Sequence, residues 1–296
     1  MNSKEIFLHA DDYGLSPQTS AQILACCQSG LLDGISILPN FSCFEEDMKL
    51  LCDAQPAFSR TVTCSVHLNL IEGPCVADPA QIRDLVDDRG FLCSSWGKLF
   101  LVSFLPGRQK LQQQLETEIS AQMKKIVEAL PFQKGVYVDG HQHTQMIPVV
   151  FDALCAVIAR EGYEMTYIRN SAEPLLPFLK HTELWNTYRP VNLVKNIILN
   201  LCAVYTADRM KELGCSPMRL WGLVMSGRMD RDRVKALMAD MTACAQKQHR
   251  QLEILFHPGR MPESEVGREY SSADALKFYL SEDREVEKAA LEQMKD

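Results

Sequence analysis

Five residues that could share a metal-assisted reaction lie at four widely separated places in this 296-residue chain. They are an adjacent pair of carboxylates, Asp11 and Asp12, and three histidines, His67, His141 and His257, each at or just after the end of a short apolar run. One carboxylate and two imidazoles form a ligand set suited to Zn²⁺, Mg²⁺, Mn²⁺, Co²⁺ or Fe²⁺. A second carboxylate beside the first can take a proton from an attacking water. The pattern therefore predicts metal-assisted hydrolysis.

Each of these residues also has an ordinary structural interpretation. The Asp11-Asp12 pair precedes Tyr-Gly and could form a turn or a helix cap. His67 could be a buried core histidine, and His257, which precedes Pro-Gly, could mark a turn. The argument for a site is that all of these residues coincide with the ends of predicted strands.

The pair His141 and His143 strengthens the functional interpretation. The two histidines are two residues apart, so on an extended strand they would share one face. The remaining histidines are interpreted as structural or solvated: His9, His181 and His249.

The elements that must position these residues are strands that alternate with helices. Apolar and β-rich runs predict seven strands, at residues 5–10, 34–38, 61–70, 135–139, 165–169, 219–225 and 252–256. Helical spacing of apolar residues marks 111–130, 148–160 and 230–246. Such alternation predicts an α/β fold with a parallel sheet, open or closed into a barrel. The carboxyl ends of its strands would gather the candidate residues on one face.

Two segments interrupt this alternation. Residues 72–108 and 170–215 are expected to be long insertions on the same face within a single domain that covers 1–296. Residues 272–295 are predicted to form a charged C-terminal helix. Asn40, after the second predicted strand, and Arg169, at the end of the fifth, also point toward the expected pocket, and a structural role for them is equally open.

Composition excludes several classes of partner. The net charge is −7 and the basic residues are scattered, so no nucleic acid partner is expected. The most apolar run, residues 197–204, is far shorter than the ~20 residues that span a bilayer. Eleven cysteines, an odd number without Cys-x-x-Cys spacing, favour reduced thiols. We therefore expect a cytoplasmic protein with no membrane association.

Four stretches of sequence together resemble the YdjC or ChbG-type carbohydrate deacetylase family. They are HADDYG at 9–14, VHLNL at 66–70, VDGHQH at 138–143 and LFHPG at 255–259. Each is weak alone, but they span nearly the whole chain in the order of the family. The resemblance implies an irregular (β/α) barrel of about seven parallel strands, similar to glycoside hydrolases and polysaccharide deacetylases. It also implies one divalent metal ion, with Mg²⁺ or Zn²⁺ as first choices, and removal of acetyl from N-acetylglucosamine-containing oligosaccharides.

The resemblance assigns roles by motif position. It implies Asp12, His67 and His141 as metal ligands, Asp11 as general base and His257 as general acid. The residue pattern by itself leaves Asp11 and Asp12 interchangeable, and only the resemblance places Asp12 on the metal.

The expected substrate-binding group is less specific. It comprises His143, Asn40, Arg169 and Asp139, of which Asp139 could instead orient a neighbouring imidazole. The histidine-rich motif of the family contains only two histidines here, His141 and His143, and Gln142 separates them. An N-acetylated oligosaccharide is the expected partner, and family precedent also allows a homo-oligomer.

Two rival functions remain open. A metal-independent barrel glycosidase needs two carboxyl groups on either side of the bond, about 5–9.5 Å apart, which adjacent aspartates do not naturally provide. A non-catalytic relative that binds a sugar or a metal would have no chemical need for Asp11 and His257. Chelation and measurement of acetate release would separate these functions.

Overall fold

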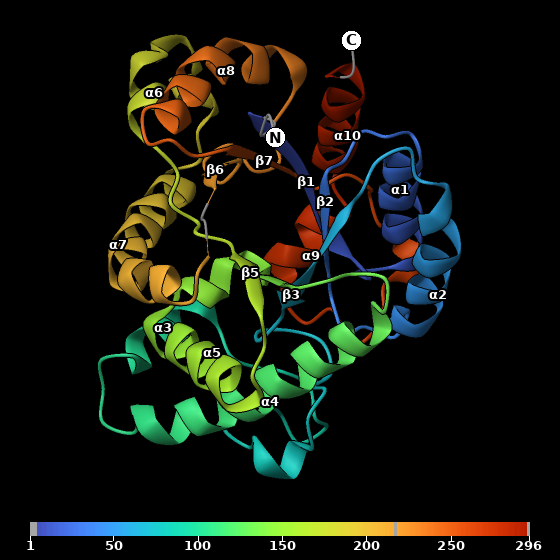
Figure 1. The fold of residues 1–296 in the computed structure, drawn as a ribbon, viewed down its shortest axis with the longest axis vertical. Helices are drawn as coiled ribbons and strands as arrows, with labels where there is room; N and C mark the ends of the chain where they lie inside the picture. Colours follow the sequence, from blue (N-terminus) through green and yellow to red (C-terminus); the bar gives the residue numbers. More distant parts are fainter. Residues whose placement is uncertain (1–4, 216–217, 295–296) are drawn as a thin grey trace.

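Seven parallel strands form one sheet in the computed structural model, which describes residues 5–215 and 218–294. The strands are β1 (Ile6–Tyr13), β2 (Gly34–Ile37), β3 (Thr63–Leu68), β4 (Val136–Gly140), β5 (Met165–Ile168), β6 (Arg219–Trp221) and β7 (Leu252–Phe256). Their spatial order is β5-β4-β3-β2-β1-β7-β6. No ladder within the described ranges joins β5 to β6, so the sheet forms an incomplete barrel (Figure 1). The expected α/β fold with an irregular barrel is confirmed.

The helices surround this sheet (Figure 1). They are α1 (Pro17–Gln28), α2 (Phe44–Ala54), α3 (Trp96–Val102), α4 (Arg108–Ala129), α5 (Pro148–Glu161), α6 (Leu176–Lys180), α7 (Pro190–Glu212), α8 (Arg231–Gln246), α9 (Ala273–Tyr279) and α10 (Asp283–Gln293). The apolar stripe of α4, including Leu115, Ile119 and Met123, is fully buried. Helix α4 contacts both α5 and β3, so this stripe belongs to the core between the outer helices and the sheet.

The sequence located all seven strands to within two residues at their starts, but β6 is shorter than expected. It ends at Trp221 because the next residue, Gly222, has a φ of +137°. The backbone N–H groups of Gly222, Leu223 and Val224 then donate to the Glu173 carboxylate at 2.7–3.0 Å. The backbone N–H groups that follow β6 therefore find their acceptor in a buried carboxylate and not in a neighbouring strand.

The segment 170–215, expected as a long insertion, contains α6 and the 23-residue helix α7. One further expectation needs correction. The single helix expected over 272–295 is two helices, α9 and α10, and residue 295 lies outside the described residues. The segment 72–108 has little regular structure before α3 apart from a 3₁₀ turn at Pro79–Gln81. No helix in the described part of the chain is both long and apolar enough to cross a bilayer.

Candidate metal centre

The end of β1 has an irregular backbone that brings two neighbouring carboxylates into one cavity. On a regular strand, Asp11 and Asp12 would point to opposite faces of the sheet. The pairing of β1 with β2 shifts register between Ala10 and Tyr13, and Asp12 has a φ of 75°. Aspartate adopts this left-handed conformation more readily than most residues. As a result, Asp11 and Asp12 both line the same cavity.

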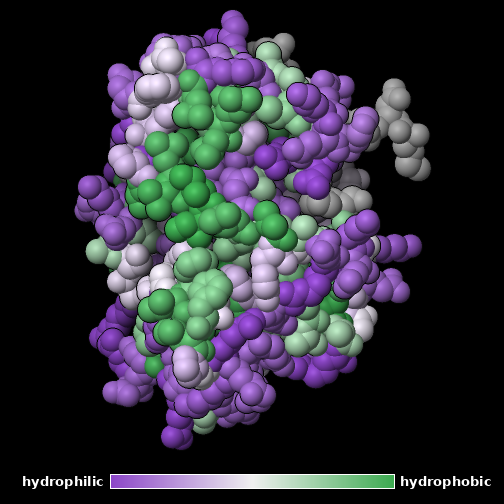
Figure 2. All heavy atoms as spheres, turned by 90° about the vertical axis from the view of Figure 1, so that its left-hand side faces the viewer, coloured by the Kyte–Doolittle hydropathy of each residue, from purple (hydrophilic) through white to green (hydrophobic). Residues whose placement is uncertain are grey.

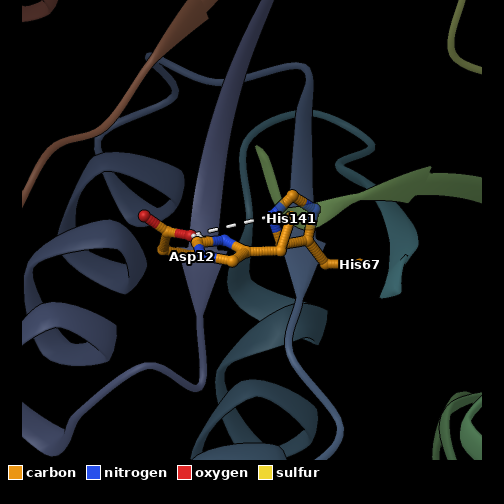
Figure 3. A group of neighbouring side chains, drawn as sticks. All are labelled: Asp12, His67 and His141. Atoms are coloured by element: carbon orange, nitrogen blue, oxygen red, sulfur yellow. Dashed lines mark ion pairs between the residues drawn. The ribbon is translucent and has the colours of Figure 1, made fainter. Parts of the chain in front are cut away.

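Asp12, His67 and His141 converge from three separate elements (Figure 3). Asp12 Oδ1 lies 3.6 Å from His67 Nε2 and 3.3 Å from His141 Nδ1. One donor atom from each residue lies within 4.8 Å of the other two. Asp12 Oδ1 is buried and has no hydrogen-bond partner among the described residues. A divalent cation fits this donor set, because it would satisfy the unpartnered oxygen and use the ring nitrogen that each histidine directs toward it.

The opposite nitrogen of each imidazole is already occupied. His67 Nδ1 lies 2.6 Å from Asp139 Oδ1, which leaves Nε2 facing Asp12. His141 Nε2 lies 3.0 Å from Glu72 Oε1 and 2.9 Å from the Tyr279 hydroxyl, which leaves Nδ1 facing Asp12. Carboxylates behind metal-binding histidines orient the rings and raise their basicity in this way.

The buried carboxylates of the cluster favour a positive charge on the group that they surround. Burial acts to lower the pKa of His141, but the nearby carboxylates of Asp12 and Glu72 outweigh burial and raise the pKa to about 9. Burial acts to raise the pKa of Asp12, yet the Arg284 guanidinium, whose Nη1 lies 2.8 Å from Oδ2, helps to hold that pKa well below its usual range. Asp12 is thus ionised, with Oδ2 bonded to Arg284 and Oδ1 facing the imidazoles of His67 and His141.

Asp11 is held by a buried arginine. Arg169 Nη1 and Nη2 donate to its two carboxylate oxygens at 2.8 and 2.9 Å, and Arg169 also pairs with Glu253 at 2.9 Å. Burial acts to raise the pKa of Asp11, but Arg169 and the neighbouring histidines lower it well below its usual range. Asp11 is therefore ionised and fixed in orientation.

His257 follows β7 and is oriented by a carboxylate of α10. Glu287 Oε2 accepts a hydrogen bond from the His257 backbone N–H at 2.6 Å and lies 3.2 Å from Nδ1. Burial acts to lower the pKa of His257, but Glu287 outweighs it and the pKa is raised. The imidazole lines the same cavity as Asp11 and Asp12.

The cavity has a volume of about 600 Å³ and extends from the cluster toward α7 and α9. His143 lines this cavity. The expectation that His141 and His143 share one face of an extended strand is wrong, because β4 ends at Gly140, and Gln142 and His143 have left-handed backbones with φ of 51° and 63°. His143 Nδ1 lies 2.9 Å from the Ser171 hydroxyl, and burial lowers the pKa of its imidazole. It is thus a neutral group at the cavity wall.

The other three residues expected to bind substrate lie behind the cavity. Among the described residues, Asn40, Asp139 and Arg169 are not part of its lining. The Asn40 amide donates to the backbone oxygens of Glu72 and Pro74 at 2.9 and 3.0 Å. Asp139 contacts His67, and Arg169 contacts Asp11. These contacts are with other residues of the protein, so they indicate a role in orienting the site and not in contacting a substrate.

Sequence reasoning missed four supporting residues. Glu72 and Tyr279 contact His141, Arg284 contacts Asp12, and Glu287 contacts His257. Arg284 and Glu287 lie in α10, whose charged sequence resembles a solvated surface. Tyr279 lies between Phe278 and Leu280, so nothing in its local sequence distinguishes it from its apolar neighbours.

The fold and the cluster define a class of protein: an incomplete parallel α/β barrel with a candidate divalent-metal centre where its strands end. This chain belongs to the YdjC-like protein family, whose model matches residues 5–295.

Relatives with assigned names support the same grouping. The chain is 26% identical over 174 residues to a carbohydrate deacetylase of Danio rerio, covering 59% of this chain and 52% of that one. It is 30% identical over 168 residues to a carbohydrate deacetylase of Mus musculus, covering 55% and 49%. The match spans about half the length of these curated relatives.

A solved structure shows the same fold. It is that of an Enterococcus faecalis protein provisionally assigned to cellobiose-phosphate cleavage, with a TM-score of 0.61, 16% identity, and coverage of 98% of this chain and 94% of that one. At this level of identity the likeness concerns the fold alone.

Proposed function

We propose that this protein is a metal-dependent hydrolase that removes the acetyl group from N-acetylated sugars, with N-acetylglucosamine-containing oligosaccharides as the substrate class. The observation that carries the proposal is the convergence of Asp12, His67 and His141 in one cavity with Asp11 and His257. The names of the relatives support the sugar and the reaction. The cytoplasmic location expected from the sequence stays a prediction.

Asp12 Oδ1, His67 Nε2 and His141 Nδ1 are the atoms that would hold one divalent ion, for which we propose Mg²⁺ or Zn²⁺. Such an ion, when bound, supplies Lewis-acid polarisation to the acetamide carbonyl and acidifies water. Asp139 and Glu72 fix the two imidazoles that face it.

The proton transfers are assigned to Asp11 and His257. Asp11, kept ionised by Arg169, accepts a proton from the water that attacks the acetyl carbon. A C–O bond forms and the C–N bond of the amide breaks. His257, whose pKa is raised by Glu287, is proposed to give its proton to the departing nitrogen, since an unprotonated amine anion is a very poor leaving group. The products are acetate and a free amino sugar.

The test combines acetate release with metal analysis. Protein is assayed on N-acetylated mono- and oligosaccharides before and after chelation, with the metal content of each sample measured. We expect activity to disappear with the metal and to return when Mg²⁺ or Zn²⁺ is restored. Asp11→Asn should lower turnover by roughly 10²–10⁴-fold while metal still binds. Asp88→Asn, at an exposed aspartate, is the matched control.

The rival functions give different results in the same assay. Shorter sugars without acetate, formed equally well after chelation, would identify a glycosidase. Sugar binding without any product from metal-loaded protein would identify a non-catalytic relative. Full turnover of Asp11→Asn would show that the base is another residue.

A further inference from the structure

The barrel has a second cavity at the end where its strands begin. This cavity has a volume of about 270 Å³ and is lined by residues of β1, β3, β4 and β5 and by the residues just before β6 and β7. We call it the amino-end cavity and define it by Phe7, Ser65, Tyr137, Tyr167 and Met218, which are among its lining residues. None of the described residues that line it also lines the cavity of the candidate metal centre.

The amino-end cavity lies inside the barrel, beneath the metal centre. On β3, Thr63 and Ser65 line the amino-end cavity and His67 belongs to the metal centre. On β4, Tyr137 lines the amino-end cavity, and Asp139 contacts His67. Alternate residues of a strand share one face of the sheet. The two cavities therefore occupy the two ends of one barrel interior.

A layer of buried polar side chains separates the two cavities. Glu253 accepts hydrogen bonds from the Tyr167 hydroxyl at 2.5 Å and from Arg169 Nε at 3.0 Å. Tyr167 lines the amino-end cavity, whereas Asp11, to which Arg169 also donates, lines the cavity of the metal centre. A small molecule in the amino-end cavity would therefore not occupy the place of a sugar at the metal centre.

The incomplete closure of the barrel accounts for this space. No ladder in the described ranges joins β5 to β6. Thr166 and Tyr167 of β5 and Met218, which directly precedes β6, all line the amino-end cavity. The cavity therefore lies at the gap between the two edge strands. In a closed (β/α) barrel, layers of inward side chains fill this region.

The chemistry of the lining favours a neutral aromatic ligand. Phe7, Tyr137 and Tyr167 supply aromatic surfaces, and Met218 supplies a thioether, which packs well against aromatic rings. No lysine, arginine, aspartate or glutamate is among the described lining residues, so a charged ligand would lose its hydration without gaining a counter-charge. The Ser65 hydroxyl is buried and has no hydrogen-bond partner among the described residues. A polar group on the ligand would satisfy it.

We propose that the amino-end cavity is a second binding site, for a neutral single-ring aromatic molecule that carries a hydroxyl or amide group. Phenol is the simplest member of this class. An apolar cavity of ~150 Å³ accepts benzene, so a cavity of about 270 Å³ has room for such a ring with a few further atoms. The ligand hydroxyl would pair with Ser65, and its ring would pack against the aromatic walls. This site does not depend on the proposed deacetylation.

The test is the binding of phenol to the full chain, measured by isothermal titration calorimetry. We expect a dissociation constant on the order of 0.1–1 mM, as for a ligand of so few atoms. Ser65→Val removes the hydroxyl and fills part of the cavity, and should weaken binding by about 10-fold or more. Ser94→Val is the matched control, because Ser94 is also buried, with a hydroxyl that has no partner among the described residues, but it lies outside the cavity.

Two further variants keep the test independent of one substitution. Thr63→Leu narrows the same cavity and should also weaken binding, so it replaces Ser65→Val if circular dichroism melting shows that variant to be unfolded. Large apolar side chains are also exposed on the outer side of α7, Leu201 among them. Figure 2 shows an apolar band on the side of the molecule that carries α7. Leu201→Glu should leave phenol binding unchanged, because the proposed site is inside the barrel.

Methyl NMR of the methionines locates the ligand. The Met218 methyl resonance, assigned with Met218→Leu, should shift on addition of phenol with the dissociation constant found by calorimetry. Benzoate, which is charged, should cause no such shift.

Several results would overturn the proposal. They are the absence of phenol binding at concentrations well above the expected range, a Met218 methyl that does not shift, and wild-type affinity in the folded cavity variants. Loss of binding in Leu201→Glu would place phenol on the outer surface instead. Binding of benzoate as tight as that of phenol would contradict a site for neutral ligands.

Discussion

Replacing Glu287 with glutamine should move the alkaline limb of the pH–rate profile to lower pH. Glu287 Oε2 lies 3.2 Å from His257 Nδ1, and the pKa of His257 is raised by this contact against the effect of burial. Because His257 acts as a protonated acid in the proposed reaction, activity falls as pH rises through its pKa. Hydrogen bonds to charged groups contribute ~1.5–3 kcal/mol and those to neutral groups ~0.5–1.5 kcal/mol. The midpoints of these ranges differ by about 1.25 kcal/mol, which is close to the ~1.4 kcal/mol of one pKa unit.

The assay is kcat for acetate release as a function of pH, together with the NMR titration of the His257 imidazole. We expect both the alkaline limb and the imidazole pKa to fall by about one unit in Glu287→Gln. Glu292→Gln, at an exposed position of the same helix, should change neither. If the imidazole pKa falls while the alkaline limb stays in place, His257 is not the acid. If neither moves, Glu287 does not control the ionisation of His257.

Three further substitutions test the residues behind the site. Asp139→Asn removes the carboxylate behind His67 and should weaken metal binding by about 10–100-fold in calorimetry; unchanged affinity would show that Asp139 does not orient the ligand. Arg284→Met leaves the Asp12 carboxylate buried with one charge partner fewer, and should lower the free energy of unfolding by about 3–5 kcal/mol in urea. The double variant with Asp12→Asn should recover part of that loss, and simple additivity would refute a direct coupling. Glu173→Ala leaves three backbone N–H groups without their acceptor and should cost roughly 3 kcal/mol by thermal melting; an unchanged melting temperature would contradict its role in ending β6.

The strands were predictable because their signal is local. A buried parallel strand is a short apolar run, and a polar cluster after it marks the end that faces a pocket. Thus β1, with Asp11 and Asp12 at its end, could be placed from a dozen residues. Helix α7 gave no such signal, because it is apolar on its buried side and on its exposed side, and a one-sided stripe is what identifies a surface helix in a sequence.

The geometry of the site depends on contacts that no local pattern contains. The backbone irregularity at Asp12 and the left-handed residues Gln142 and His143 break the strand periodicity on which the sequence argument relied. Arg284 and Glu287 read as members of a charged, solvated helix, yet both are fully buried. Their burial follows from pairing with Asp12 and His257, residues that are distant in the chain, and such pairing requires the tertiary fold.

The contact between Arg284 and Asp12 joins residues 272 positions apart. During translation Asp12 leaves the ribosome 272 residues before Arg284, so its carboxylate lacks this counter-charge until α10 has been made. A nascent chain can thus assemble most of the barrel before the centre is electrostatically complete. Ribosome-bound intermediates that end ahead of α10 should retain the sheet but leave Asp12 with a higher pKa, which would delay tight binding of the proposed metal until α10 is complete.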